Sequence, residues 1–312
     1  MSPKQYRQQR GVALITAILI VALASATAIA MVERQQLDIR RTANLLDNDR
    51  GYLFSLGAES WVRGILDTDR KDNKIDALAE DWAIELPPLT VEDGSVLGRV
   101  EDMQGRFNIN NLVDNEGKIS ALDVARFKRL LQAFDLSPDL ADAALDWIDK
   151  DADSTFPGGA EDGEYLGNNI PYRTANALMA SPSELLLVKG FTYEAYTQLS
   201  PYIAALPERT NINLNTAPPP VLQTIAANIA TAEAEAIAES RGEEGLNDVQ
   251  DFLALPALNG RNVDANGLGV SSQYFMLTTH SQFGSSRGIL YSLIKRPASG
   301  KITVVIRGQG AY

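Results

Sequence analysis

Residues 12–32, VALITAILIVALASATAIAMV, decide the fold, because this run of twenty-one residues contains no charged side chain. A helix needs about 20 apolar residues to cross a bilayer, so the run is long enough to span a membrane. The preceding segment, MSPKQYRQQRG, holds Lys4, Arg7 and Arg10 and no acid. Because basic flanks stay on the cytoplasmic side, we expect the rest of the chain to lie across the membrane.

The helical pattern does not stop at the end of the apolar run. Between Glu33 and Leu66 there is no proline, and apolar side chains recur at approximately helical spacing. The sequence therefore predicts one helix over 12–66, transmembrane over 12–32 and about 80 Å long at 1.5 Å per residue. Three glycines at 51, 57 and 64 weaken this helix locally and mark where a bend would fall.

Three classes of protein begin with a basic leader and an apolar run. A secretory signal peptide is one, and the alternating small residues of 22–28 offer cleavage sites for its peptidase. A plain uncleaved anchor is another. The third is a precursor of the type IV pilin kind, which residues 1–33 resemble in their order of basic leader, glycine, apolar run and charged helix. The unbroken pattern after Val32 favours this third class.

The composition excludes several kinds of function. The chain has 312 residues, 45% of them hydrophobic, which is enough to bury a core. A formal net charge of -12 opposes binding to nucleic-acid phosphates or anionic lipid. There is no cysteine, and the one histidine, His280, lies in an alternating segment typical of a strand. The composition therefore excludes thiol catalysis, disulfide bonds and most catalytic triads and metalloenzyme sites. We expect that the chain is not an enzyme.

Strand patterns flank a long helical block. An Asp-Gly turn at 93–94 predicts a hairpin, and alternating segments return near the C-terminus. We expect an α+β fold in which the hairpin pairs with the C-terminal strands and the sheet packs on the polar half of the first helix. The predicted strands are 89–91, 95–102, 274–280, 288–295 and 301–307, and a short helix is predicted over 74–86. The predicted units are a leader over 1–11, the helix over 12–66, a sheet domain over 67–112 and 271–312, and a helical insertion over 113–270.

The helical insertion looks internally repeated. An Asn-Ile-Asn sequence at 108–110 precedes a helix containing Leu-Gln at 131–132, and a similar sequence at 211–215 precedes one containing Leu-Gln at 222–223. Each copy continues into an Ala-rich helix, so we predict two helical modules.

The second module begins like a helix-hairpin-helix DNA-binding element. Such elements need a glycine-rich hairpin whose amides meet a phosphate. Here the hairpin is Ala-Ala-Asn-Ile-Ala at 226–230 and acidic residues follow it. A packing or protein–protein role is the better interpretation.

Two acidic clusters, DKDAD at 149–153 and EDGEY at 161–165, indicate a cation site. Carboxylates at this density repel one another unless they are solvated or share a cation, and oxygen ligands in a loop suit calcium. The start resembles an EF-hand loop, but Ser154 and Ala160 stand where glycine and glutamate are required. A solvated acidic loop is the alternative. The candidate ligands are Asp149, Asp151, Asp153, Glu161, Asp162, Glu164 and, from the next helix start, Glu184.

Taken in order, these features resemble the K-type minor pseudopilins of type II secretion systems, the general secretion pathway protein K family. The resemblance covers nearly the whole chain. It is carried by Arg10-Gly11 before Val12-Ala13-Leu14, FNINNL at 107–112, WIDKD at 147–151, EDGEY at 161–165, SELL at 183–186 and NIN at 211–213.

The resemblance implies a type IV pilin-like fold with a large α-helical insertion that holds one or two calcium ions. It implies cleavage by prepilin peptidase after Gly11 and methylation of the new N-terminus at Val12. Most pilins carry Glu at the fifth mature position, and its replacement by Thr16 is usual for the K-type.

The resemblance also implies a location and partners. The chain would be a single-pass protein of the inner membrane of a Gram-negative bacterium, with its C-terminal domain in the periplasm. It would lie at the tip of the pseudopilus with the I-type and J-type minor pseudopilins, and would work with the major pseudopilin and the inner-membrane platform in protein export. The competing classes are an anchored nucleic-acid receptor and a minor pilin of a type IV pilus.

Overall fold

The structure is a computed structural model that describes residues 10–84 and 88–310. Most of the predicted leader, residues 1–9 with Lys4 and Arg7, lies outside the described residues. Gly11, Val12 and Thr16 lie inside them, at the start of the first helix.

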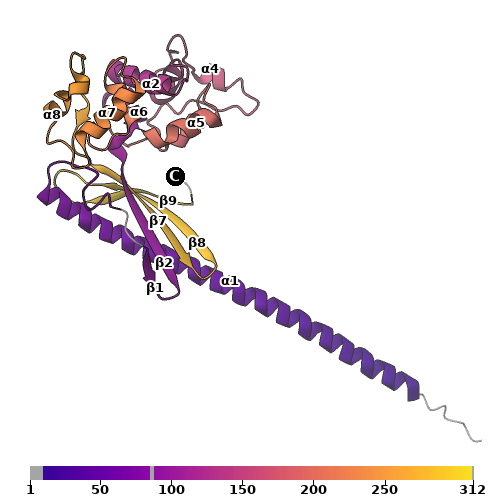
Figure 1. The fold of residues 1–312 in the computed structure, drawn as a ribbon. Coiled ribbons are helices and arrows are strands. Elements are labelled where there is room, and N and C mark those ends of the chain that lie inside the picture. Colours follow the sequence, from indigo (N-terminus) through magenta and orange to yellow (C-terminus); the bar gives the residue numbers. More distant parts are fainter. Residues whose placement is uncertain (1–9, 85–87, 311–312) are drawn as a thin grey trace, which may run out of the picture.

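One helix, α1 (Arg10–Asp72), dominates the shape of the molecule (Figure 1). It extends six residues beyond the predicted end and runs without interruption through all three glycines. Its N-terminal half is exposed, whereas a stripe in its C-terminal half is buried against the sheet. This stripe has the spacing of one helical face; its members are Gly51, Ser55, Glu59, Val62, Leu66 and Asp69. A Cβ on Gly51 would lie 2.7 Å from Ser281 Oγ, so glycine permits the close approach of helix and sheet.

The predicted sheet is confirmed. It is antiparallel with the order β1-β2-β7-β8-β9, so the hairpin pairs with the C-terminal strands across the insertion. Apolar residues of α1 and of the sheet, together with Trp82, form the core between them. The strands are β1 (Leu89–Val91), β2 (Gly94–Asp102), β7 (Tyr274–Phe283), β8 (Ser286–Lys295) and β9 (Thr303–Gln309).

The prediction of a short helix over 74–86 was wrong for the described residues through Ile84, which form turns. The amide of Asp76 donates to Val270 O at 2.9 Å and that of Ala79 to Glu243 O at 3.1 Å. These bonds to the insertion replace the bonds that a local helix would make, so tertiary contacts override the local preference.

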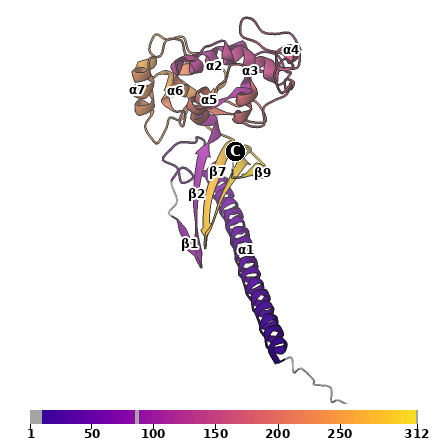
Figure 2. The ribbon, with the colours of Figure 1, turned by 90° about the vertical axis from the view of Figure 1, so that its right-hand side faces the viewer.

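The helical insertion lies at the end of the sheet that is farther from the N-terminus of α1 (Figures 1 and 2). Both modules contribute to one continuous apolar core. A short helix, η1 (Met103–Gly105), joins β2 to the insertion. The first module contains β3 (Phe107–Asn108), η2 (Ile109–Leu112), α2 (Ala121–Ala133), α3 (Leu140–Ile148), α4 (Asp162–Tyr165), η3 (Pro182–Leu187), α5 (Tyr193–Leu199), η4 (Ser200–Tyr202) and β4 (Ile203–Ala204). The second contains β5 (Ile212–Asn213), α6 (Pro219–Leu222), η5 (Gln223–Ile225), α7 (Thr231–Arg241), α8 (Val249–Leu253), η6 (Pro256–Leu258) and β6 (Leu268–Gly269).

Each module contains a buried asparagine whose side chain hydrogen-bonds to the backbone of a distant segment of the same module. In the first, the side chain of Asn110 accepts from Met179 N at 2.9 Å and donates to Met179 O at 2.9 Å and to Leu206 O at 2.8 Å. In the second, Asn215 accepts from Leu246 N at 2.9 Å and donates to Leu246 O at 3.0 Å. Each module also begins and ends in short parallel strands, β3 with β4 and β5 with β6.

One helical prediction in the second module needs correction. The segment 221–239 is not one helix, because α6 and η5 end at Ile225 and α7 starts at Thr231. Asn228, between them, has a φ of 58°, which a helix cannot accommodate. Arg261 donates to the carbonyls of Ala227 and Asn228, so this hairpin is held by the protein itself.

Candidate metal centre

The predicted acidic loop starts where α3 ends. The amide of Asp149 closes the helix by donating to Leu145 O at 3.0 Å, and its extended backbone then turns the chain outward. Trp147, buried on α3, makes an edge contact with the ring of Tyr165 at 5.4 Å between centroids. This contact fixes the far end of the loop beside its start.

Three carboxylates converge as a result. Asp149, Asp151 and Glu161 each offer an oxygen, and these oxygens lie within 4.8 Å of one another. Asp149 is 3% exposed and Glu161 is 8% exposed. Asp149 Oδ1 and Glu161 Oε1 are buried without a hydrogen-bond partner. A buried carboxylate oxygen without a partner is costly, so the cluster presents open ligand atoms to a cation.

The electrostatics of the cluster point the same way. Burial, reinforced by the charges of Asp151 and Asp146, raises the pKa of Asp149 to about 6. Burial and the neighbouring acids raise the pKa of Glu161 to about 7. A bound cation would remove this mutual repulsion and displace the protons.

Two of the other candidate ligands are held by basic side chains and hydroxyls. Asp162 accepts from the amide and hydroxyl of Thr174 at 3.1 and 3.0 Å, and it lies 3.4 Å from Arg173. Glu164 pairs with Lys189 at 3.3 Å.

The remaining two candidates lie apart from the three converging oxygens. Glu184 caps its own helix by accepting from Ser181 N at 3.3 Å, and it also accepts from Ala180 N at 2.6 Å and from Trp147 Nε1 at 3.3 Å. The carboxylate of Asp153 is exposed, and its amide donates to Asp151. The structure therefore brings together three of the seven candidates.

Sequence reasoning missed one acid of this region. Asp146 lies three residues before Asp149 on α3, is fully buried, and accepts from Thr155 N at 3.0 Å. The signal was available, because residues three apart share a helix face.

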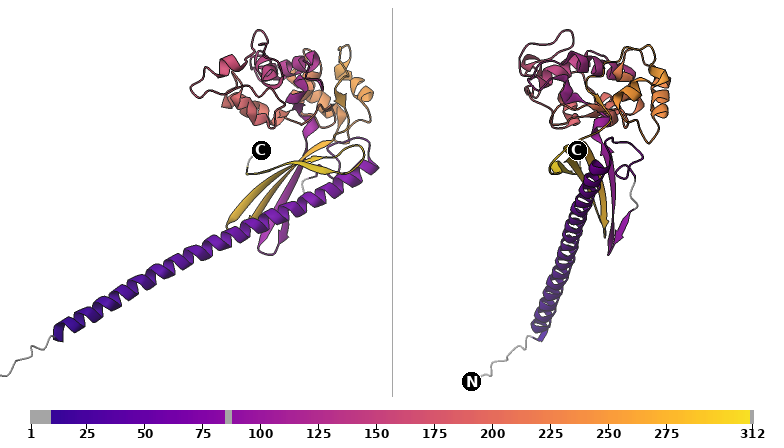
Figure 3. Two further views of the ribbon diagram at one scale, coloured as in Figure 1. Left: turned by 180° about the vertical axis from the view of Figure 1, so that it is seen from behind. Right: turned by 90° about the vertical axis from the view of Figure 1, so that its left-hand side faces the viewer.

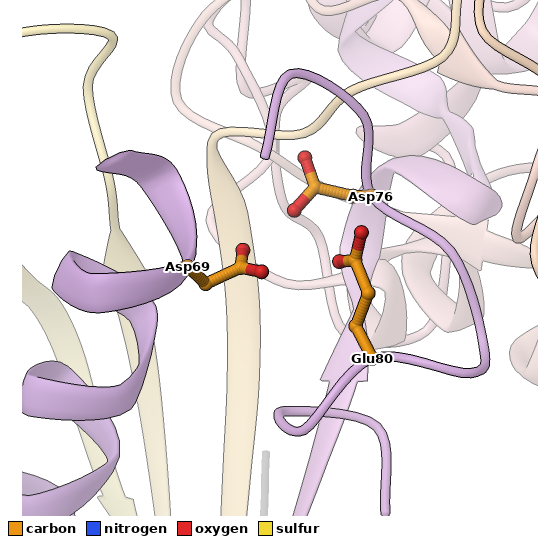
Figure 4. A group of neighbouring side chains, drawn as sticks. All are labelled: Asp69, Asp76 and Glu80. Carbon is orange, nitrogen blue, oxygen red and sulfur yellow. The ribbon is translucent and has the colours of Figure 1, made fainter. Parts of the chain in front are cut away.

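A second group of acids lies at the junction of α1, the sheet and the insertion, and sequence reasoning did not find it. Asp69, Asp76 and Glu80 point toward one another in Figure 4, with oxygens within 4.8 Å. Arg296, at the end of β8, donates to Asp69 and Asp76 at 2.5 Å and stacks on Phe275. The guanidinium neutralises Asp69 and Asp76 as a buried ion pair, and Glu80 accepts from Trp82 Nε1 at 2.6 Å. This group is therefore structural.

The same junction ties the second module to the sheet. Asp102, buried at the end of β2, accepts from Asn213 at 2.8 Å, from Ser272 at 2.7 Å and from Thr216 at 2.5 Å. Burial raises the pKa of Asp76 to about 6 and that of Glu80 to about 7. This polar network fixes how the insertion sits on the sheet.

These features define a class of protein. Among the described residues, α1 is the helix long and apolar enough by composition to cross a membrane, with a mean hydropathy of 2.6 in its most apolar window. Its other half packs on an antiparallel sheet that carries a helical insertion. The fold is therefore that of a pilin-like protein with an N-terminal apolar helix.

Comparisons with known proteins identify the family. A family model described as "Type II secretion system (T2SS), protein K" matches residues 212–271, and a companion model for its first domain matches residues 105–208. The type II secretion system protein K of Pseudomonas aeruginosa is 35% identical over 97% of this chain and 94% of its own length. That of Aeromonas hydrophila is 32% identical over 97% and 98%.

A solved structure agrees with these relatives. It is the crystal structure of the GspK-GspI-GspJ complex from enterotoxigenic Escherichia coli, with a TM-score of 0.77 at 27% identity, covering 87% of this chain and 100% of the matched one. The chain belongs to the protein K family of type II secretion systems, which are minor pseudopilins. The predicted fold class and family are thereby confirmed.

Proposed function

We propose that this chain is the tip subunit of the periplasmic pseudopilus, where it starts assembly and supports the export of folded proteins across the outer membrane. The position of the insertion carries the proposal. It covers the end of the sheet opposite the N-terminal end of α1 (Figure 3). A subunit stacked above this one would collide with it, so the chain suits the end of a fibre.

Thr16 supports the same position. Its hydroxyl donates to Val12 O at 3.1 Å and Ala13 O at 3.0 Å within its own helix. In most pilins, a glutamate at this position pairs with the N-terminal ammonium of the subunit ahead. A first subunit has no subunit ahead, and an unpaired carboxylate at that depth would only add cost.

The partners follow from the solved complex, which contains the K, I and J proteins. We infer that this chain assembles with the I-type and J-type minor pseudopilins, and through them with the major pseudopilin and the inner-membrane platform. Large apolar side chains on α1 are exposed well beyond the apolar run, including Leu53 at 64% and Trp61 at 56%. Helices of neighbouring subunits that leave the same membrane would cover them.

We also propose that the apolar part of α1 anchors the chain in the inner membrane with the C-terminal domain in the periplasm. Prepilin peptidase would cut between Gly11 and Val12, and Val12 would then be methylated. A Cβ on Gly11 would have nothing within 4 Å, so the backbone there is accessible.

Calcium is the cofactor that the acidic loop would hold. Asp149, Asp151 and Glu161 supply hard oxygen ligands, two of which are buried and unpartnered. A second ion would draw on the other candidates after they release their protein partners. Bound calcium would tie the loop after α3 to the body of the insertion.

Electron microscopy tests the tip assignment. A gold label attached at Gly260, which is exposed and has nothing within 4 Å of its Cβ position, should appear at one end of each filament. Deletion of the chain should remove the label and abolish secretion. Labels spaced regularly along filaments would refute the proposal.

Intact mass and N-terminal sequencing test the processing. The native chain should begin at Val12, and Gly11→Val should leave an uncut precursor in the membrane. Gly57→Ala, at another open glycine of the same helix, is the matched control. A native N-terminus near Ala28 would show instead that the apolar run is an ordinary signal peptide.

A further inference from the structure

Asp146 is a buried carboxylate beside the candidate calcium site, and no cationic side chain pairs with it in the described part of the chain. It lies on α3 one turn before Asp149 and is 0% exposed. Both of its oxygens face one donor, the amide of Thr155, at 3.2 and 3.0 Å. A buried charge held by one amide is costly, so its presence indicates a role beyond packing.

The acidic loop folds back around this carboxylate. The amide of Gly159 donates to Thr155 O at 2.7 Å. A Cβ on Gly159 would collide with Asp146 Oδ2 and with the backbone of Thr155, so only glycine fits there. Asp146 thus contacts both the middle of the loop and its returning end.

The return of the loop is what brings the ligands together. Ala160, which follows the glycine, is 2% exposed, and Glu161 comes next. Glu161 is twelve residues from Asp149, yet their carboxylates converge. Gly158 packs against Asp139 at the start of α3, and the bond between Asp146 and Thr155 links the loop to the other end of this helix.

We propose that Asp146 is the positioning residue of the cation site, which rests on the proposed calcium binding. It holds Thr155, shapes the turn at Gly159, and so returns Glu161 to its place. Its charge strengthens the negative field at the site while its oxygens stay bound to the loop. Changes in residues that orient metal ligands typically weaken metal affinity by about 10 to 100-fold.

Calorimetric titration of the full-length chain in detergent with calcium chloride tests the proposal. Asp146→Ala removes the acceptor and the charge, and should weaken calcium binding by about tenfold or more. Asp146→Asn keeps one acceptor oxygen for the amide of Thr155, so its calcium affinity should fall by less than that of Asp146→Ala. Asp251→Asn removes an exposed charge on α8 of the second module, and should change the affinity by less than about twofold.

Hydrogen exchange without calcium gives a second measurement. The segment 151–160 should be protected in the unchanged chain and in Asp251→Asn, and should lose protection in Asp146→Ala. A merely structural role would lower the melting temperature of Asp146→Ala and leave its calcium affinity unchanged.

Three results would overturn the assignment, and they are distinguishable. Equal calcium affinity in Asp146→Ala and in the unchanged chain would show that Asp146 does not position the cation site. Equal loss in the alanine and asparagine variants, with unchanged exchange, would make Asp146 a direct ligand. If the unchanged chain bound no calcium, the proposed cation site would be refuted, and the positioning role of Asp146 would be refuted with it.

Discussion

The two modules of the insertion share a scaffold and differ in what they attach to it. Each turns between helices at a residue in the left-handed conformation, Asp135 with a φ of 56° and Asn228 with a φ of 58°. After α3, the first module continues into the long acidic loop. After α7, the second continues into a short turn through Gly242 and Gly245, both with positive φ. The helices set the frame, and the loop after α3 carries the carboxylates of the proposed cation site.

The modules also differ in their surroundings. The second provides Asn213, which joins the buried network at the end of the sheet. The first exposes large apolar side chains near its acidic loop, such as Phe156 at 92% and Ile170 at 81%. Among the described residues, 205–271 show no such exposed side chain. Both modules therefore hold the insertion on the sheet, the first through Glu208, which accepts from Tyr274 and Lys295. The first module also presents an exposed apolar surface.

The largest expected effect comes from breaking the anchor of the second module. Arg296→Met would leave Asp69 and Asp76 buried without their cation, which typically costs about 3–5 kcal/mol. Denaturant unfolding followed by circular dichroism measures this loss. Arg99→Met, at an exposed arginine paired with Glu101, is the control and should cost under about 1 kcal/mol. Equal costs in the two variants would mean that the network does not anchor the insertion.

The asparagine contacts test whether the modules are equivalent. Asn110→Ala leaves several buried backbone groups of the first module without partners, at about 1–3 kcal/mol for each group after relaxation. We expect a loss of about 3 kcal/mol. Asn215→Ala should cost less, because its bond to Val270 O is 3.5 Å long. Thermal melts of both variants rank them, and the reverse order would contradict the comparison.

Calcium should separate the modules more clearly. At a concentration one hundred times the dissociation constant, bound calcium should stabilise the folded chain by about 3 kcal/mol by mass action. Hydrogen exchange should slow in the first module and stay unchanged in the second. A chelator should reverse the effect, and the double variant Asp149→Asn with Glu161→Gln should abolish it. Identical melting temperatures with calcium and chelator, and no ion by elemental analysis, would leave only a solvated loop.

The smallest effect is the pH dependence of the calcium-free chain. The pKa values of Asp149 and Glu161 are raised to about 6 and about 7, so the folded state holds their protons more tightly than the unfolded state. Their protonation therefore contributes stability at low pH, which is lost as the pH rises from about 4 through 7. We expect a loss on the order of 1 kcal/mol per group.

Melting temperatures between pH 5 and pH 8 measure this loss. The same double variant should reduce the slope and leave the part due to Asp76 and Glu80, whose pKa values are also raised. Saturating calcium should flatten the dependence of the unchanged chain in the same way. A slope that neither treatment alters would place the titrating groups elsewhere in the chain.

Several features were readable from local pattern alone. The apolar run of 12–32 specifies a long helix because its period and length need no partner to be recognised. The Asp-Gly turn, with Asp93 at a φ of 64°, specifies the hairpin for the same reason. The acidic loop was visible as charge density, and its outer members were close enough in sequence to be grouped.

Other features required contacts between distant segments. The turns of 75–84 replace a predicted helix because Val270 and Glu243 supply partners for their amides. The helical segment of 221–239 is broken because Arg261, more than thirty positions from Asn228, holds the hairpin carbonyls. Local preference amounts to tenths of a kcal/mol per residue, whereas one unsatisfied buried group costs more.

The sequence by itself determined the apolar helix, the class of fold, and the acidic region for which we propose a cation, because these depend on composition and on periods of two to four residues. Only the tertiary structure decided which three acids converge, and that Asp146 accepts from the amide of Thr155 in their loop. It also decided that Arg296, 227 positions from Asp69, neutralises the acids of the junction. Which charged residues converge depends on how the buried apolar surfaces pack. Packing brings together residues that are far apart along the chain, and the sequence gives no pattern from which such contacts can be predicted.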